Sequence, residues 1–324
     1  MADHMRVAIG LPSDATDEHL VFAKQLGCEG VVLATPARLP GERRWEYEDL
    51  VQLREWVESY GLRIEAIQNM PHAFWNKVRL GLPGRDEELE NVLATIRNVG
   101  RAGIPVLAYN FRPDPLYRTG RKPGRGGAIV TTFDIELAQD RPLTFGRVFT
   151  AEEMWANYEY FIKAAIPVAE EAGVRLALHP DDPPGFDIGG VARIFSSFEA
   201  FERASHIVES PSWGLLFCVG CWSEMGGHDY VLRGIRHFGP RGQIVYVHFR
   251  DVQGTDGHFA ECFIGEGNVR VTEVMRALKE VGFTGCLIDD HVPHMVGDTG
   301  WAPRGRAYST GYLMGLLRAV LDLT

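Results

Sequence analysis

The sequence lacks the features that direct a chain to membranes, nucleic acids or secretion. No apolar run approaches the roughly 20 residues that span a bilayer, and the N-terminus lacks the charged and then apolar pattern of a secretory signal. Lysine and arginine are spread rather than clustered, and the formal net charge is −10 at pH 7, so neither a nucleic acid nor an anionic membrane finds a basic surface. We therefore expect a cytoplasmic protein with a small-molecule ligand.

The sequence also lacks a disulfide framework and a nucleotide-binding motif. Its five cysteines are irregularly spaced in 324 residues, so we expect reduced, mostly buried thiols. No P-loop or Gly-x-Gly-x-x-Gly follows a strand and opens a helix. Composition does not change along the chain, and its length fits one α/β barrel as well as two ordinary domains.

Short β-branched apolar runs alternate with amphipathic segments along the whole chain, which is typical of βα units around a parallel sheet. These runs predict eight strands, at Val7–Leu11, Gly30–Leu33, Arg63–Ile67, Val106–Asn110, Arg175–His179, Leu215–Cys218, Ile244–His248 and Cys286–Asp290. The segments between them predict helices at Asp17–Gln25, Tyr47–Ser59, Glu87–Arg101, Ala151–Ala172, Phe198–Ser205, Thr272–Val281 and Ser309–Leu321. The sequence therefore predicts a single (β/α)₈ TIM barrel over residues 1–324.

Two connections are longer than the alternation of strands and helices requires. The segment 111–150 is rich in glycine, proline and arginine and follows a predicted strand. The segment 291–308 is similar in composition and position. Long connections without predicted secondary structure usually carry function. Both would lie at the carboxyl end of the barrel, where such barrels place their active sites. We expect a lid or binding loop at 111–150, closing over an anionic substrate, and an active-site segment at 291–308.

Four of the predicted strands end in a side chain able to bind a metal ion. These side chains are His179, Cys218, His248 and Asp290. Strand ends of one barrel converge on one mouth, so the four can meet despite their separation in sequence. Two imidazoles, a thiolate and a carboxylate suit a divalent transition ion. Taken singly, each has an ordinary structural explanation; the coincidence at strands five to eight favours a metal site.

Other residues near these strand ends are candidates for catalysis or substrate binding. His291 follows Asp290 and is a base that titrates near neutral pH, and Tyr308 precedes the last predicted helix. His294 is a weaker candidate for the role of His291, and Cys221 is a weaker candidate for the metal. Two arginines just beyond strand ends could pair with a carboxylate, Arg112 and Arg250.

Five segments together carry a family resemblance that none carries alone. They are Tyr109-Asn110-Phe111-Arg112-Pro113, Leu178-His179-Pro180-Asp181-Asp182-Pro183-Pro184, Phe217-Cys218-Val219-Gly220, Val247-His248-Phe249-Arg250-Asp251 and Asp290-His291. With them, nearly the whole chain resembles the mannonate dehydratase family of xylose-isomerase-like TIM barrels. That family converts D-mannonate to 2-keto-3-deoxygluconate and water, which is the reaction of a hydro-lyase.

The resemblance implies a role for each of these residues. The metal, usually Mn²⁺ with Fe²⁺ or another divalent ion as alternatives, would be held by His179, Cys218, His248 and Asp290. Acid–base roles fall to His291 and Tyr308, and substrate contacts to His72, to Asn110 and to the loop after it. Barrels of this kind often pair, so we expect a homodimer.

The sequence around the last ligand departs from the family. The family commonly reads Arg-Pro-Asp-His-Gly-His there, whereas this chain reads Ile288-Asp289-Asp290-His291-Val292-Pro293-His294. A divergent branch acting on another sugar acid is therefore an alternative. Two other hypotheses stay open. A metal-dependent sugar isomerase or epimerase would use the same barrel with more carboxylate ligands, and a non-catalytic sugar-acid binding protein would not need an acid–base residue beside its metal.

Overall fold

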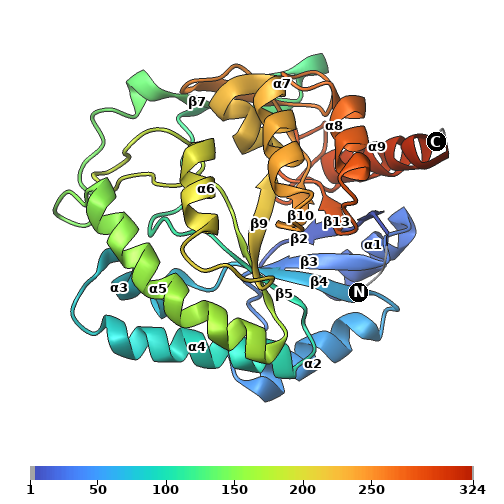
Figure 1. Cartoon of the computed structure of the whole chain (residues 1–324). Helices are drawn as coiled ribbons and strands as arrows, with labels where there is room; N and C mark the ends of the chain where they lie inside the picture. The colour runs from blue at the N-terminus through green and yellow to red at the C-terminus, as the bar shows by residue number, and fades with distance from the viewer. Residues whose placement is uncertain (1–3, 323–324) are drawn as a thin grey trace.

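The computed structural model describes residues 4–322 and has the predicted (β/α)₈ barrel at its centre (Figure 1). Its first strand is split into β1 (Arg6–Val7) and β2 (Ile9–Leu11). Because β1 pairs with the last barrel strand and β2 with the second, the parallel sheet closes on itself. All eight predicted strands are therefore confirmed.

The remaining barrel strands follow one another around the ring in chain order. They are β3 (Gly30–Ala34), β4 (Arg63–Gln68), β5 (Val106–Tyr109), β8 (Arg175–Leu178), β9 (Trp213–Cys218), β10 (Ile244–His248) and β13 (Cys286–Ile288). The helices around them are α1 (Asp17–Leu26), α2 (Tyr47–Glu58), α3 (Asn76–Leu80), α4 (Arg85–Arg101), α5 (Ala151–Ala172), α6 (Phe198–Ser205), α7 (Val219–Phe238), α8 (Val271–Glu280) and α9 (Pro303–Asp322).

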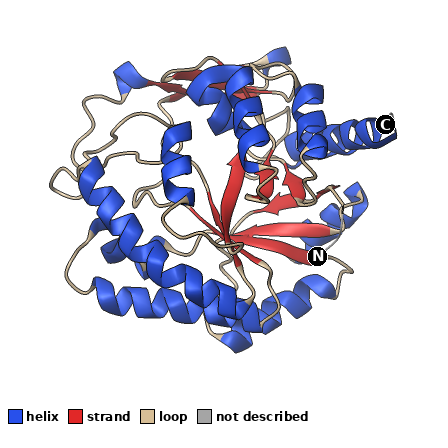
Figure 2. Ribbon diagram, in the orientation of Figure 1, coloured by secondary structure: helices blue, strands red, loops and turns tan. Residues whose placement is uncertain are grey.

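Side chains alternate between the inside and the outside of the barrel, as the period of a strand requires. The inward positions form a separate cluster of mostly small residues that includes Ala8, Ala66, Ala108 and Ala177. The outward positions join the apolar faces of the helices in a much larger cluster. Small residues inside the barrel let the strands approach closely, and the helices, which Figure 2 shows surrounding the strands, cover the apolar exterior.

The segment 111–150 contains strands, so the expectation of a connection without secondary structure is wrong. It contributes β6 (Gly120–Pro123) and β7 (Ile129–Asp134), which join β12 (His258–Cys262) and β11 (Asp251–Gln253) in a four-stranded antiparallel sheet. Short 3₁₀ turns at Arg125–Gly127 and Ile135–Leu137 flank β7. One face of this sheet is apolar, since Phe133, Val252 and Phe259 pack with Ile188. It lies beyond the carboxyl ends of the barrel strands, at the top of Figure 2.

The last helix begins at Pro303, six residues before the predicted start at Ser309. Proline suits the first helical position because its φ is already helical. Gly305 is buried within this first turn, and a Cβ there would lie 2.4 Å from the carbonyl oxygen of Pro293. This glycine therefore allows close packing of the helix on the segment before it. The segment 291–308 is consequently a loop only as far as residue 302.

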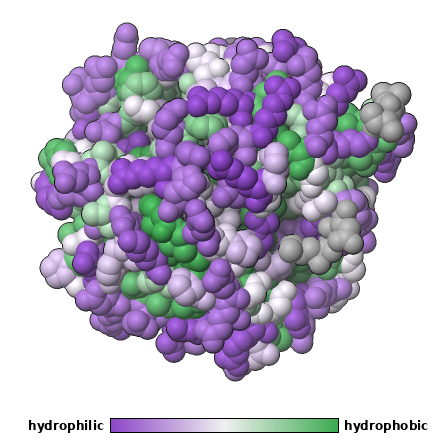
Figure 3. Space-filling model, viewed as in Figure 1, coloured by the Kyte–Doolittle hydropathy of each residue, from purple (hydrophilic) through white to green (hydrophobic). Residues whose placement is uncertain are grey.

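The face of the molecule drawn in space-filling form is mostly polar (Figure 3). In the part of the chain from residue 4 to residue 322, no helix is both long and apolar enough to cross a membrane. On the face shown in Figure 3, hydrophilic side chains predominate and hydrophobic ones form small separate groups. Large exposed hydrophobic side chains include Val296 on the segment before α9 and Leu137 and Val148 near the small sheet.

Candidate metal centre and active site

Three of the predicted metal ligands meet at the carboxyl ends of neighbouring strands. His179 directly follows β8, Cys218 ends β9 and His248 ends β10, and in the parallel register His248 is paired with Cys218. The three ligand atoms lie within 4.8 Å of one another. The register of the barrel strands thus brings together residues that lie up to 69 positions apart in the sequence.

Asp290, the fourth predicted ligand, borders this cluster. It lies two residues beyond β13, and its Oδ2 is 3.3 Å from Nδ1 of His248 and 4.0 Å from Sγ of Cys218. Burial raises the pKa of Asp290, but the charges of His291 and His248 hold it well below its usual range. The structure thus brings all four predicted ligands together, with the carboxyl group ionised.

The two histidines each turn one ring nitrogen towards the cluster. Nδ1 of His179 donates to the carbonyl oxygen of Pro180 at 2.6 Å, which leaves Nε2 with a lone pair. Nε2 of His248 donates to Oε1 of Gln68 at 3.0 Å, while its Nδ1 is buried without a hydrogen-bond partner among the described residues. A hydrogen bond on the opposite nitrogen is the usual means by which proteins orient a metal-binding imidazole.

The two cysteines near the cluster differ in charge. Burial raises the pKa of Cys218, but a hydrogen bond with Cys221 and the charge of Arg250 bring it well below the ordinary value for a thiol. Burial and the neighbouring sulfur raise the pKa of Cys221 well above that value. Cys218 is therefore the thiolate, the form that binds metals, whereas Cys221 stays a neutral thiol.

Arg250, predicted to contact the substrate, lies at the centre of a buried ion network, and its contact with the substrate stays a prediction. Its Nε lies 3.1 Å from Oδ2 of Asp290, its Nη1 2.7 Å from Oε1 of Glu224, and its Nη2 3.0 Å from Oδ2 of Asp182. Glu261 lies 3.1 Å from Nη1. Asp182, Cys221 and Glu224 also lie close enough to hold a cation, but the guanidinium group already occupies that position. Arg250 therefore holds carboxylates of the protein itself.

His291 is fixed beside the cluster by a carboxylate. Its Nδ1 donates to Oε1 of Glu261 at 2.9 Å, and its Nε2 lies 3.7 Å from Oδ1 of Asp290. Burial lowers the pKa of His291, but the charges of Asp290 and Glu261 outweigh this and raise it. Arg118 completes the arrangement by binding Glu261 at 2.9 Å and Asp182 at 2.5 Å. The imidazole is held at one nitrogen and exposes the other edge of its ring.

Two hollows open at this end of the barrel. The first, which we call the metal-side hollow, has a volume of about 560 Å³ and is lined by Gln68, His248 and Asp290. The second, the lid-side hollow, measures about 170 Å³ and is lined by Arg118, Glu261 and His291. Gly300, Trp301 and Arg306 line both. The two hollows are therefore neighbouring parts of one mouth, with the candidate ligands His248 and Asp290 on one side and His291 on the other.

Of the remaining predicted substrate residues, Asn110 and Arg112 are buried and His72 is half-buried, and none of the three lines either hollow. Nδ2 of Asn110 donates to Oδ1 of Asn69 at 2.9 Å. Nδ1 of His72 donates to the carbonyl oxygen of Pro113 at 2.9 Å, and burial together with the charge of Arg79 lowers its pKa to about 4. Arg112 donates to the carbonyl oxygen of Asp114. Each is thus bound to the protein itself, and its contact with substrate stays a prediction.

The structure does not bring Tyr308 to the metal cluster. Its ring packs against Phe263 and Tyr312 at centroid distances of 5.2 and 6.1 Å, and the guanidinium of Arg125 lies 5.4 Å from it. Tyr308 follows Arg306 by two helical positions, about 200° around the helix, so the two side chains leave α9 on different sides. His294 does line the lid-side hollow.

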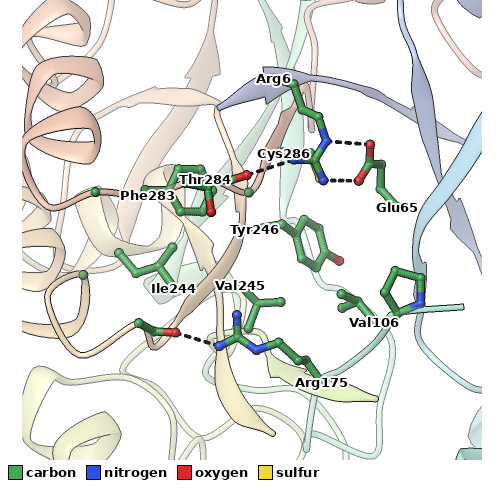
Figure 4. A pocket seen from close by; sticks show the side chains of 15 residues that line it. Arg6, Glu65, Val106, Arg175, Ile244, Val245, Tyr246, Phe283, Thr284 and Cys286 are labelled. Carbon is green, nitrogen blue, oxygen red and sulfur yellow. Dashed lines mark hydrogen bonds and ion pairs between the residues drawn. The ribbon is translucent and has the colours of Figure 1, made fainter. Parts of the chain in front are cut away.

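The opposite end of the barrel holds a further cavity, away from these residues. It measures about 250 Å³ and is lined by residues at the starts of the strands (Figure 4). Nε of Arg6 donates to Oε1 of Glu65 at 2.8 Å, and Arg63 donates to the same oxygen at 2.7 Å. Burial raises the pKa of Glu65, but the hydrogen bond and charge of Arg6 lower it overall. This cluster seals the base of the barrel.

Several residues of the site were not predicted from the sequence. Gln68 ends β4 and orients His248. Its position at a strand end could have marked it as a residue of the mouth. Trp301 and Arg306 follow no strand and belong to a connection and to the first turn of α9. The carboxyl groups around Arg250 come from a connection, a helix and a strand, namely Asp182, Glu224 of α7 and Glu261 of β12. Only the fold shows that these residues meet.

The fold and the strand-end site define a class of protein, the TIM barrels with a candidate metal centre at the carboxyl ends of their strands. A xylose isomerase domain protein from Planctomyces limnophilus superimposes with a TM-score of 0.66 and 15% sequence identity, covering 98% of this chain and 99% of that chain. At this identity the likeness shows the fold alone.

Closer matches identify the family. A family model described as D-mannonate dehydratase (UxuA) matches residues 13–144 and 134–323. The mannonate dehydratase of Streptococcus pneumoniae (strain 70585) is 33% identical over 325 residues, covering 90% of this chain and 87% of that protein. The crystal structure of mannonate dehydratase from Streptococcus suis serotype 2 has a TM-score of 0.89 and 32% identity, covering 99% of this chain and 96% of that chain. This chain belongs to the mannonate dehydratase family.

Proposed function

We propose that the protein is a hydro-lyase that converts D-mannonate to 2-keto-3-deoxy-D-gluconate and water with the help of a divalent cation. One observation carries the proposal: a His–Cys–His cluster, with ligand atoms within 4.8 Å of one another, lies at the same mouth as the imidazole of His291. The names of the family and of its relatives support the choice of substrate.

The residues present fit a divalent cation. The buried Nδ1 of His248 lacks any hydrogen-bond partner among the described residues, and the thiol of Cys218 favours its ionised form. We propose that these two residues hold the cation together with His179 and Asp290, and that the ion is Mn²⁺, with Fe²⁺ as the alternative. When bound, such an ion supplies Lewis acidity that makes the C2 proton of a chelated 2-hydroxy acid easier to remove.

We assign proton transfer in the dehydration to His291. The reaction requires a base that takes the C2 proton and an acid that protonates the C3 hydroxyl as it leaves as water, after which the enol becomes the 2-keto acid. Glu261 binds Nδ1 of His291 and fixes the ring, so Nε2 is the atom that exchanges the proton. Tyr308, predicted for the other half of the reaction, is not in contact with either hollow, and that role stays a prediction.

Arg250 and Arg118 act by positioning. Arg250 binds both the ligand Asp290 and the carboxylate Glu261, which in turn orients His291. Arg118 binds Glu261 from the other side. The ion network thus links the candidate metal ligand to the candidate acid–base residue and keeps them in one arrangement, which is the pre-organisation that catalysis requires.

The test is an assay for 2-keto-3-deoxy acids after incubation of the purified protein and Mn²⁺ with a panel of aldonates. We expect the acid from D-mannonate and none from its C2 epimer. The His291→Asn variant should bind Mn²⁺ normally and lose about 10²- to 10⁴-fold in kcat. Isomerised free sugars without any keto acid would instead identify a sugar isomerase or epimerase, and aldonate binding without turnover would identify a binding protein.

The cytoplasmic location and the homodimer also belong to this proposal. Light scattering of the purified protein measures the second directly. We expect a particle of twice the 36.2 kDa chain mass, and a particle of one chain mass would exclude the dimer.

A further inference from the structure

Arg306 occupies a position at the mouth that nothing in the proposed mechanism uses. It lies in the first turn of α9 and lines both the metal-side and the lid-side hollow. Its Nη1 donates to Oδ2 of Asp289 at 2.7 Å and its Nε to the carbonyl oxygen of Trp301 at 2.9 Å. The structure records no hydrogen bond from Nη2 within residues 4–322, and 19% of the side chain is exposed.

Of the other guanidinium groups around the mouth, that of Arg121 is exposed and lines only the lid-side hollow, and the remaining ones are committed to the protein. Arg250 is in contact with four carboxylates and is 2% exposed. Arg118 binds Asp182 and Glu261, and Arg112 donates to a backbone carbonyl. Among the described residues that line the metal-side hollow, Arg306 is the only lysine or arginine. A carboxylate entering this hollow therefore meets one guanidinium with a donor to spare.

Asp289 and Trp301 hold Arg306 in the orientation that this contact needs. The carboxyl group of Asp289 is buried and accepts a second hydrogen bond from the backbone nitrogen of Gly10 at 3.4 Å, so it is itself fixed. The indole nitrogen of Trp301 donates to the carbonyl oxygen of Gly10 at 3.2 Å. A guanidinium tethered at Nε and Nη1 has lost most of its freedom before a ligand arrives, which reduces the entropic cost of binding.

We infer that Arg306 is a specificity-determining residue, which selects an anionic substrate by donating from Nη2 to the carboxylate of the sugar acid. The inference rests on the proposed function, because it takes the substrate to be an aldonate bound beside the candidate metal ligands. A charge-assisted hydrogen bond of this kind favours the acid over the corresponding polyol or free sugar, which offers only a hydroxyl at C1. Asp289 directly follows β13 and accepts a hydrogen bond from Arg306, so it is the positioning residue for Arg306.

The test compares Arg306→Gln, Arg306→Lys and a matched control. Arg318→Gln removes the same charge from an exposed position on the same helix. Steady-state kinetics with D-mannonate should show KM raised roughly 10- to 100-fold in Arg306→Gln with kcat within about three-fold of the parent, the size expected for one hydrogen bond to a charged group. Arg306→Lys should recover part of this loss, because it keeps the charge without the fork. The control should match the parent.

Calorimetric titration of the Mn²⁺-loaded proteins with D-mannonate and with D-mannitol separates this inference from the proposed function. We expect Arg306→Gln to lose affinity for mannonate and to bind mannitol as the parent does. If the parent binds mannonate without converting it, the proposed function fails while the inference stands on this loss of affinity. Equal affinity of parent and Arg306→Gln for mannonate overturns the inference, as does a fall in kcat with an unchanged KM, since Arg306 would then act only through Asp289.

Discussion

Replacing Gly220 with alanine tests whether Arg250 is held as rigidly as its contacts indicate. Gly220 lies in the first turn of α7, where an added Cβ would stand 2.4 Å from both Cζ and Nη1 of Arg250. Ordinary van der Waals contact begins near 3.4 Å, so the guanidinium would have to retreat by roughly 1 Å. Its hydrogen bond to Glu224 and its ion pair with Asp290 would then stretch well beyond their present 2.7 and 3.1 Å.

The expected cost follows from this displacement. Overpacking a core typically costs about 1–3 kcal/mol, and breaking a buried ion pair costs about 3–5 kcal/mol. Because the guanidinium is displaced rather than removed, we expect about 3 kcal/mol in the free energy of unfolding. With an unfolding entropy of about 2.1 cal/mol/K per residue, this lowers the melting temperature of the 324-residue chain by about 4 °C.

Thermal unfolding followed by circular dichroism measures this effect, with Gly311→Ala as the control. Gly311 is an exposed glycine of α9 that has open space where a Cβ would be, so alanine there should stabilise by about 0.5–1 kcal/mol through helix propensity. If Gly220→Ala melts within 1 °C of the parent and binds Mn²⁺ equally well, Arg250 does not hold the network as described.

Two further predictions concern the two ends of the barrel. Cys218→Ala should weaken Mn²⁺ binding by at least roughly 100-fold in calorimetric titration. Cys28→Ala removes a buried thiol away from the cluster and should leave Mn²⁺ binding unchanged. Equal binding by both variants would refute the metal site. Glu65→Gln should cost roughly 2 kcal/mol at pH 7. Because Arg6 lowers the pKa of Glu65 in the folded state, this stabilisation is present above the unfolded pKa and is lost as the pH falls through the folded one. Urea unfolding should therefore show parent and variant converging below about pH 4, and a constant difference would contradict the assignment; the exposed Glu87→Gln should differ little at any pH.

The sequence was sufficient to predict the barrel and its metal cluster because both depend on local periodicity. Apolar runs of strand length fix where each strand ends, and parallel closure then places those ends at one mouth. The positions of His179, Cys218 and His248 therefore followed once the strands were counted. Asp290 lies two residues beyond its strand, and its side chain still reaches the cluster.

The small antiparallel sheet and the start of α9 could not be predicted in the same way. The strand β6 is fully exposed, so it carries no apolar alternation, and its pairing with β7 is visible only in three dimensions. In α9, the glycine and arginines of the first turn suggest a loop, although Gly305 serves close packing there. Tyr308 was expected at the start of a helix facing the mouth, and the earlier start of the helix carries it past that position.

The charges gathered at the mouth explain why a cluster with this ligand set is suited to a divalent cation. Burial raises the pKa of Glu224 to about 8, so this carboxyl group is mostly neutral at pH 7. Two guanidinium groups then face three carboxylates and one thiolate, namely Arg118, Arg250, Asp182, Glu261, Asp290 and Cys218. These six side chains sum to −2, and the charges of His248 and His291, which lower the pKa of Asp290, offset this sum unless a cation displaces the proton of His248. The arginines of the ion network therefore leave negative charge for the metal. A guanidinium that can bind the substrate has to come from outside this network, and Arg306, which lines the metal-side hollow, supplies it.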